Sequence, residues 1–252
     1  DVHENIPGQI RTKEWLPRFL RKPLAWMASR LLRIAEQRLE ITLAETGYRG
    51  LFVGEHPVFP NYLVGDPAPP TDSDPAVGVV YLGDVTQERG LAFAVEAVAA
   101  AGASAMTIMG RCKPDFQERL LETASRRSLP LEFRGFVDPA EALAVAARGQ
   151  VGLSPLLDTP NYRASLPTKI LEYLAVGIPT VASDLPGTRS VVADKAGVIL
   201  VEPGNVAAGE TAVRRVIHDV GLRAAAADGA TALKQEYVWP GDAVRAVYAG
   251  LL

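Results

Sequence analysis

The chain has 252 residues, 48% of them apolar, and a formal net charge of −3. This length and composition suit a soluble α/β protein with one or two buried cores, and the charge gives no indication of nucleic-acid binding. The single cysteine, Cys112, excludes an internal disulfide and a cysteine-rich metal site, and the three histidines lack metal-ligand spacing. Because no transmembrane-length apolar run and no signal peptide are found, we expect a cytoplasmic protein.

The first patterned segment is 11–38, which reads as helices that are both basic and apolar. It holds eight basic and two acidic residues, a net charge of +6, together with apolar side chains such as Trp15, Phe19 and Trp26. A basic amphipathic stretch with aromatic residues is typical of a peripheral contact with an anionic membrane. The sequence leaves an alternative open, in which the apolar side packs inside the protein and the charges face water.

From residue 77 onward, short apolar runs alternate with amphipathic helices, the pattern of a doubly wound parallel sheet. We predict a Rossmann-like domain with six strands, a turn at 184–187, and ligands bound at the carboxyl ends of the strands. No P-loop, G-x-G-x-x-G fingerprint or G-x-S-x-G elbow occurs. The predicted strands are 77–82, 105–109, 131–133, 151–153, 180–182 and 197–201, and the predicted helices lie near 90–101, 115–127, 139–147, 168–176, 206–220 and 222–235.

The stretch from Ser165 to Val181 carries the strongest functional pattern. Pro167 and Thr168 suit a helix start, where free N–H groups and the positive dipole end can hold a phosphate. Glu172 follows about one turn later, where its carboxylate can accept both hydroxyls of a ribose whose diphosphate rests on the helix tip. A glycine then ends the helix before a buried strand. The alternative is an ordinary helix with a surface glutamate.

This stretch resembles the donor-site signature of the retaining, GT-B-fold nucleotide-sugar glycosyltransferases, in the variant Ser-x-Pro-x-Lys-x-x-Glu-Tyr. The resemblance implies an α/β fold of GT-B type, with one complete Rossmann-like donor domain and part of a second, acceptor domain. Many members carry two carboxylates in this stretch, of which the later one, matching Glu172, binds ribose and the earlier one contacts the sugar. Ala164 stands at the position of the earlier carboxylate. The implied boundaries are 1–66 for the partial acceptor domain, 67–76 for a Pro- and Asp-rich linker, 77–236 for the donor domain and 237–252 for a helix crossing back.

The resemblance also implies roles for individual residues. Arg89 stands immediately before Gly90, like the basic residue that binds the donor diphosphate in the family, and Lys169 is the second implied catalytic cation. The family often has another basic residue after Gly83, where this chain has Asp84. Phe136 and Val137 are the implied neighbours of the nucleobase, although Phe136 could equally be core. The implied donor-binding residues are Gly83, Arg111, Phe136, Val137, Ser165, Leu166, Pro167, Thr168 and Glu172.

The start of the chain resembles the Val-Tyr-Asp-x-His-Glu segment of the family's acceptor domain. This implies that His3 and Glu4 lie on the acceptor side and that roughly half of that domain is absent from the sequence. In the alternative, Asp1 is a genuine N-terminus or the start of a processed chain, and His3 has no role in the site. Residues 56–62 resemble the family's interdomain segment, and the last helix follows Trp239 as it does in the family.

These patterns predict transfer of a sugar from a nucleoside diphosphate donor to an acceptor hydroxyl with retention, in polysaccharide or glycolipid synthesis. No cofactor or metal is expected, and UDP is the guess for the nucleotide. Predicted partners are the donor, a lipid-linked acceptor, the inner membrane surface through 11–38, and a second copy of the chain. The alternative is a catalytically inactive nucleotide-binding module that acts in regulation or assembly, favoured by the loss of the carboxylate at Ala164.

Overall fold

The computed structural model describes residues 1–13, 15–59, 77–165, 167–192, 194–237 and 241–249, and the chain divides into two compact units. The predicted linker, 67–76, lies outside the described residues. Residues 159–166 belong to the first unit, whereas the sequence pattern placed them in the donor domain. The units comprise Asp1–Tyr62, Thr159–Leu166 and Val238–Leu252 in the first, and Leu63–Asp158 and Pro167–Tyr237 in the second.

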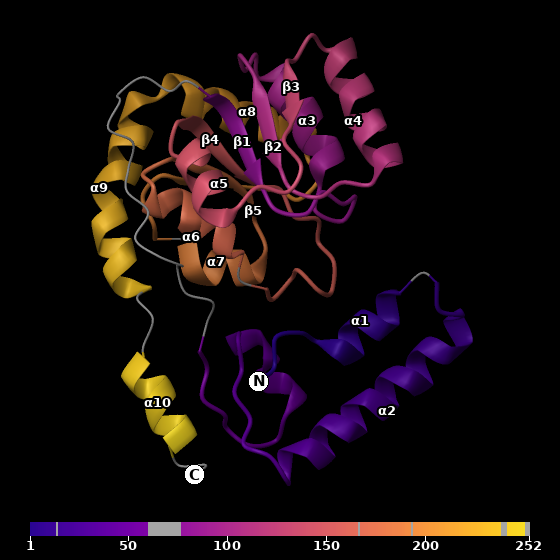
Figure 1. Ribbon diagram of the computed structural model, residues 1–252. Helices are drawn as coiled ribbons and strands as arrows, with labels where there is room; N and C mark the ends of the chain where they lie inside the picture. Colours follow the sequence, from indigo (N-terminus) through magenta and orange to yellow (C-terminus); the bar gives the residue numbers. More distant parts are fainter. Residues whose placement is uncertain (14, 60–76, 166, 193, 238–240, 250–252) are drawn as a thin grey trace. The chain divides into compact units, whose positions relative to one another are not determined.

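The second unit is built on a six-stranded parallel sheet with the order β3-β2-β1-β4-β5-β6 (Figure 1). All six predicted strands are confirmed. Successive strands are added on one side of β1 up to β3 and on its other side from β4 onward, although all strands are parallel. The carboxyl ends of β1 and β4 therefore form the topological switch point where such sheets bind ligands. The strands are β1 Val77–Leu82, β2 Met106–Met109, β3 Leu131–Phe133, β4 Gly149–Ser154, β5 Thr180–Ser183 and β6 Val198–Val201.

The central strands β1 and β4 are largely buried because both faces of the sheet are covered, and even the polar Ser154 at the end of β4 is buried. Val79, Val80 and Tyr81 of β1 are all fully buried, as expected for a parallel sheet packed between helices. Strand β4 is longer than predicted and begins at Gly149, because Gly149 lies beside Val77 in the parallel register with β1.

Helices cover both faces of this sheet (Figure 1). On one face α3 packs between α4 and α8, and on the other α6 packs between α5 and α9. Helix α7 was not predicted, since the sequence suggested only a turn at 184–187; Pro186 instead occupies the first helical turn, where its fixed φ is suitable. The helices are α3 Leu91–Ala100, α4 Pro114–Arg126, α5 Pro139–Ala146, α6 Thr168–Ala175, α7 Pro186–Val192, α8 Val206–His218 and α9 Val220–Glu236.

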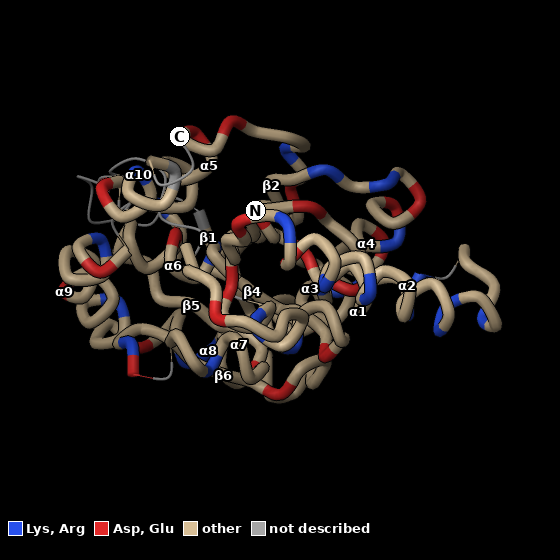
Figure 2. Tube along the Cα trace, turned by 90° about the horizontal axis from the view of Figure 1, so that it is seen from below, with Lys and Arg blue, Asp and Glu red and all other residues tan. Residues whose placement is uncertain are grey.

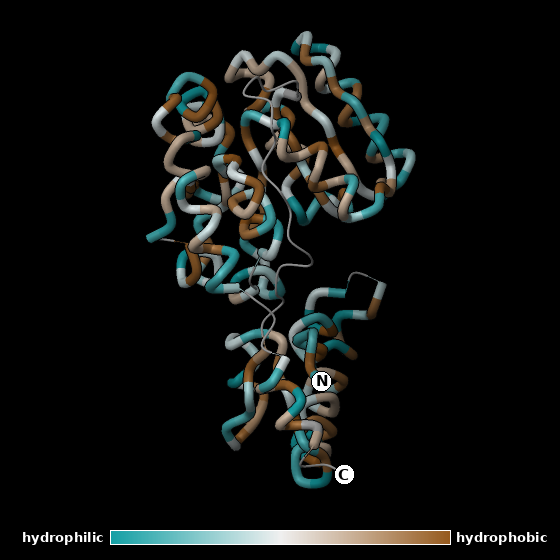
Figure 3. Tube along the Cα trace, turned by 60° about the vertical axis from the view of Figure 1, so that its left-hand side comes forward, coloured by the Kyte–Doolittle hydropathy of each residue, from teal (hydrophilic) through white to brown (hydrophobic). Residues whose placement is uncertain are grey.

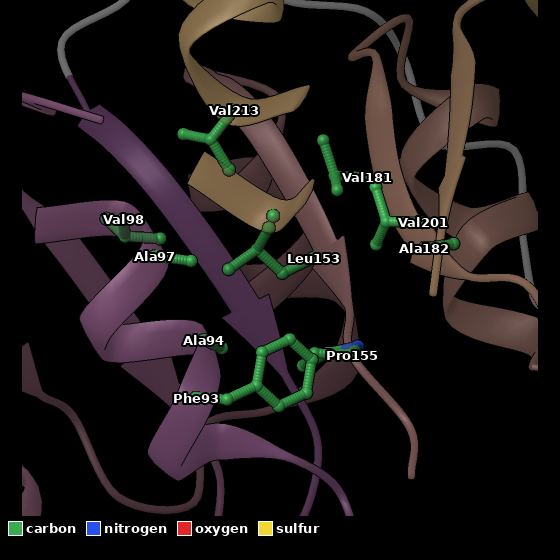
Figure 4. A pocket seen from close by; sticks show the side chains of 11 residues that line it. Phe93, Ala94, Ala97, Val98, Leu153, Pro155, Val181, Ala182, Val201 and Val213 are labelled. Carbon is green, nitrogen blue, oxygen red and sulfur yellow. The ribbon is translucent and has the colours of Figure 1, made fainter. Parts of the chain in front are cut away.

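The core on the α3 and α8 face holds a small apolar cavity (Figure 4). Its volume is about 20 Å³, and its lining includes Phe93, Leu153, Val181 and Val213. A cavity of that size holds about one water molecule, and its walls are apolar. It is therefore a packing feature of the core and not a site for a nucleotide.

The first unit contains short parallel pairings, Val2 with Leu43 and Leu43 with Val58, over a core that includes Ile41 and Phe52. The sequence predicts helices within 11–38, and the structure has two there: α1 ends at Thr12, and α2 covers Arg18–Glu36 with Pro17 (φ −53°, ψ 133°) directly before it. None of the helices in the described residues combines the length and apolar character needed to cross a bilayer. The helices are α1 Ile6–Thr12, α2 Arg18–Glu36, the 3-10 helix η1 Thr46–Leu51 and α10 Gly241–Ala249.

Candidate functional site

Two cationic side chains converge on the glycine that ends β1. Gly83 has φ of +115°, and a Cβ built on it would lie 2.9 Å from the Lys169 Nζ and 3.5 Å from the Arg89 Nη1. Lys169 comes from the first turn of α6, and Arg89 from the loop that leads into α3. Both side chains are half-buried. The missing side chain of Gly83 therefore leaves the space in which these two cations approach each other.

The electrostatics of this pair favour an anion. Burial, and then the neighbouring Arg89, lower the pKa of Lys169 to about 8, while Glu172 and Asp84 act in the opposite direction. Lys169 is thus still mainly protonated at pH 7, although its charged form is disfavoured in the empty site. The Lys169 Nζ also lies 5.7 Å from the centroid of the Tyr81 ring. A ligand that brings negative charge here would relieve the repulsion between the two cations.

Glu172 lies one turn after Lys169 on α6 and is half-buried. Burial raises the pKa of the Glu172 carboxyl, and the charge of Lys169 opposes that shift. The spacing of three residues places the two side chains on the same side of the helix. The carboxylate is therefore held beside the cations, at the distance along the helix that the sequence pattern indicated.

Tyr173 holds α6 against the sheet, a role that the sequence analysis missed. Its ring is fully buried, its hydroxyl accepts a hydrogen bond of 2.8 Å from the Leu82 amide, and a side chain at Gly152 of β4 would collide with the ring. The residue was part of the Glu-Tyr pattern, but nothing local indicated that it faced β1. Tyr173 connects the helix that carries Lys169 and Glu172 to the end of the strand that leads into Gly83.

Two further glycines bring the neighbouring loops close to this point. Gly90, with φ of +75°, packs so tightly against the Pro155 carbonyl oxygen that a Cβ would overlap it. Gly110, which follows β2, packs in the same way against the Gly83 carbonyl. Because only a residue without a side chain fits either place, the loops after β1, β2 and β4 meet at one edge of the sheet.

Arg111 and Phe136 form an exposed stacked pair at the ends of β2 and β3. The Arg111 guanidinium carbon lies 4.9 Å from the centroid of the Phe136 ring, and Phe136 is 68% exposed. The alternative that Phe136 belongs to the core is therefore wrong. Val137, in contrast, is half-buried and packs against the apolar cluster beneath α5. The Gly110 amide donates to the Gly135 carbonyl over 2.7 Å, which joins the two strand ends.

The residues before α6 are divided between the two units. Thr168 is the first helical residue and Pro167 its N-cap, as predicted, and both belong to the second unit. Ser165 belongs to the first unit, where its hydroxyl donates to the Glu45 Oε1 over 3.3 Å. Leu166 lies outside the described residues. The sequence pattern had grouped all four because they are adjacent in the chain.

His3 and Glu4 lie in the first unit near a tyrosine that the sequence analysis missed. The Tyr48 hydroxyl donates to the His3 carbonyl over 2.9 Å. Burial and the nearby carboxylates of Glu45 and Glu4 raise the pKa of the Tyr48 hydroxyl. Tyr48 therefore remains a neutral donor at physiological pH. It joins the chain start to the segment that binds Ser165.

In the part of the chain that the structure describes, no group of three or more His, Cys, Asp or Glu side chains is arranged to hold a metal ion. The two cations that converge on Gly83, Lys169 and Arg89, have side chains whose chemistry suits phosphate oxygens.

The chain is similar in fold to sucrose-phosphate synthase from Thermosynechococcus elongatus, with a TM-score of 0.74 and 19% identity over 98% of this chain and 67% of that one. It is also similar to Anabaena HepE in complex with UDP and glucose, with a TM-score of 0.70 and 15% identity over 90% and 67% of the two chains. These likenesses confirm the predicted α/β fold of GT-B type.

A mutant of S. aureus TarM, in complex with fondaparinux, alpha-GlcNAc-glycerol and UDP, gives a TM-score of 0.70 at 13% identity, covering 89% of this chain and 46% of TarM. The present chain thus spans about two thirds of the first two proteins and less than half of TarM. No curated protein sequence matches the chain.

Residues 76–219 match the family described as Glycosyl transferases group 1. The match covers more than half of the chain and includes the strand ends, the two cations and Glu172. The chain therefore belongs to the glycosyl transferases group 1 family.

Proposed function

We propose that the chain binds a nucleoside diphosphate sugar at the carboxyl edge of the second unit's sheet and serves sugar transfer to an acceptor hydroxyl with retention. The observation that carries this proposal is the convergence of Lys169 Nζ and Arg89 Nη1 on Gly83, at the switch point of the sheet. Two cations beside a helix N-terminus form a site for a diphosphate.

The same groups would act in the chemical step. When the bond from the sugar to the phosphate breaks, negative charge develops on the departing diphosphate. Lys169, Arg89 and the amides at the start of α6 would stabilise that charge, and a preorganised donor of this kind contributes about 3 kcal/mol. No proton transfer from Lys169 is needed, because its charge alone serves this purpose.

The nucleoside would extend from the diphosphate along the same edge of the sheet. Glu172, held on α6 by the packing of Tyr173, would accept the ribose hydroxyls. The exposed Phe136 ring, with Arg111 stacked on it, would offer an apolar face to the base. HepE and TarM are described in complex with UDP, which supports UDP as the first nucleotide to test.

The proposal also includes the stereochemistry of transfer and the acceptor. Retention rests on the resemblance of 165–181 to the retaining enzymes. In this proposal the second unit is the donor unit, and the first unit, with His3 and Glu4, contributes to the acceptor side. The acceptor would be a hydroxyl of a polysaccharide or glycolipid precursor.

A second candidate is a nucleotide-binding module without transfer activity. Ala164 favours it, because many family members carry at this position the carboxylate that contacts the sugar. Ala164 packs against Gly47 in the first unit, where a Cβ on Gly47 would lie 2.9 Å from the Ala164 Cβ. Donor consumption in the presence of acceptors separates the two candidates, since the module would bind nucleotide without turnover.

The proposed function is tested by calorimetric titration of UDP, GDP and ADP, and of the matching nucleosides, into the full chain. We expect Arg89→Ala to weaken diphosphate binding about tenfold and to leave nucleoside binding nearly unchanged. The matched control is Arg127→Ala, which removes an exposed arginine at the end of α4. Equal losses for diphosphates and nucleosides would place Arg89 outside the phosphate site.

A further inference from the structure

Helix α2 carries apolar side chains on two opposite sides. One side packs on the first unit: Ala25 is fully buried, and Leu32 contacts the cluster of Ile41, Leu43 and Phe52. On the other side Phe19 is 78% exposed and Trp26 66% exposed, and further apolar residues follow at helical spacing. The exposed apolar residues of α2 are Phe19, Leu20, Trp26, Met27, Leu31 and Ile34, here called the α2 apolar face.

The α2 apolar face is bordered by cations. Figure 2 shows Lys and Arg recurring along α2, and Figure 3 shows hydrophobic and hydrophilic stretches alternating along the helices near the N-terminus. Lys22 and Arg33 are exposed beside the aromatic residues, and the Arg30 guanidinium carbon lies 5.8 Å from the Trp26 ring centroid. The basic residues of α2 are Arg18, Arg21, Lys22, Arg30 and Arg33.

The one acidic residue of α2 does not offset these charges on the apolar face. Glu36 accepts hydrogen bonds from the Val53 and Gly54 amides, at 3.0 Å and 2.7 Å, and its Oε1 lies 3.0 Å from the His56 Nε2. These interactions lower the pKa of Glu36, the largest contribution coming from Gly54, and hold it at the end of the helix. The rest of α2 is therefore strongly positive.

We propose that the α2 apolar face docks on an anionic lipid surface. The helix would lie in the plane of the interface over its 19 residues, a length of about 28 Å, with its apolar side chains at the headgroup boundary. Lys22, Arg30 and Arg33 would then contact lipid phosphates. A second copy of the chain is a poorer occupant, because it would bring an equally positive face and the two would repel. This inference is independent of the proposed nucleotide site.

The test measures co-sedimentation of the full chain with vesicles of phosphatidylcholine alone and of phosphatidylcholine with phosphatidylglycerol. We expect binding to the anionic vesicles only, weakened by added salt. The charge reversal Lys22→Glu/Arg33→Glu should lower the partition coefficient at least about tenfold. The matched control, Arg127→Glu/Arg148→Glu, makes the same change in net charge on exposed residues of the second unit and should bind as well as the unchanged chain.

The apolar contribution is tested separately. Phe19→Ser/Trp26→Ser should also lower the partition coefficient at least about tenfold, whereas Leu121→Ser/Val220→Ser, on exposed residues of α4 and α9, should not. Circular dichroism checks that each variant is folded. The proposal is overturned if α2 variants and controls bind alike, or if neutral vesicles bind equally well. It is also overturned if the unchanged chain is a dimer in solution that Phe19→Ser/Trp26→Ser converts to a monomer.

Discussion

The Tyr173 hydroxyl accepts a hydrogen bond of 2.8 Å from the Leu82 amide and so joins α6 to the last residue of β1. The two residues are 91 positions apart in the chain. The next residue after Leu82 is Gly83, on which Lys169 and Arg89 converge. This hydrogen bond therefore helps to position α6, which carries Lys169, relative to the end of β1 and the loop that carries Arg89.

We expect Tyr173→Phe to lower the free energy of unfolding by about 1–3 kcal/mol, because the buried Leu82 N–H loses this acceptor. Diphosphate affinity should fall as well, since α6 is released from β1. Urea denaturation and calorimetric titration measure the two effects. Tyr81→Phe is the control: it also removes a hydroxyl, but one that donates to the Asp84 carbonyl in an exposed loop. Unchanged stability for Tyr173→Phe would contradict the assigned role.

Glu172→Ala should weaken nucleoside diphosphate binding at least about tenfold, because two charge-assisted hydrogen bonds to ribose are lost. The melting temperature of the free chain should stay the same or rise, since burial disfavours the Glu172 carboxylate. Glu122→Ala, at an exposed position of α4, is the matched control. A further check compares the affinities for UDP and 2′-deoxy-UDP by calorimetry. The unchanged chain should bind UDP more tightly, whereas Glu172→Ala should bind both equally.

The pKa of about 8 for Lys169 predicts a pH dependence of diphosphate binding. Below pH 8 the side chain is charged in the empty site, and a diphosphate would hold it charged to higher pH. The titration of Lys169 should therefore make the affinity fall as pH rises above 8. Lys169→Arg keeps its charge over this range and should show a flat profile between pH 7 and about 9.5. A falling profile in that variant would assign the titration to another group.

The same pKa shift has the opposite effect on stability. The folded pKa of Lys169 is lowered below its unfolded value, so the unfolded chain binds more protons between pH 8 and about 10.4. The cost of burying the charged side chain is fully present below pH 8. It is relieved as pH rises through that window, so Lys169 by itself makes the free chain more stable there. Comparison of urea unfolding with Lys169→Met isolates this contribution.

Gly90→Ala should destabilise the fold by at least about 3 kcal/mol, since the new Cβ would overlap the Pro155 carbonyl oxygen and φ is positive. Gly102→Ala is a matched control: Gly102 has the same φ of +75°, but a Cβ there would meet nothing within 4 Å. The control should cost about 1 kcal/mol for the backbone conformation alone. Equal losses in thermal unfolding would show that the contact with Pro155 is unimportant.

Local patterns in the sequence determined the strands, most helices and the limits of α6. The apolar runs at 77–82 and 180–182 predicted buried strands because both faces of a parallel sheet are covered. Thr168 and Gly177 marked the ends of α6 because helix starts and stops depend on neighbouring residues. Local spacing placed Glu172 about one turn into α6, whereas the roles expected for Glu172 and Lys169 came from the resemblance of 165–181 to the glycosyltransferase signature.

Only the tertiary structure decided what these residues face. Lys169 approaches Arg89 because parallel crossovers bring the ends of β1 and β4 together at one edge of the sheet. Ser165 joins Glu45 in the first unit although it is two residues before Pro167. Such contacts join parts of the chain 80 to 120 positions apart, and periodicity carries no information over that separation. The exposure of Phe136 and of the α2 apolar face was likewise undecided, because an apolar residue type shows what can be buried and not what covers it.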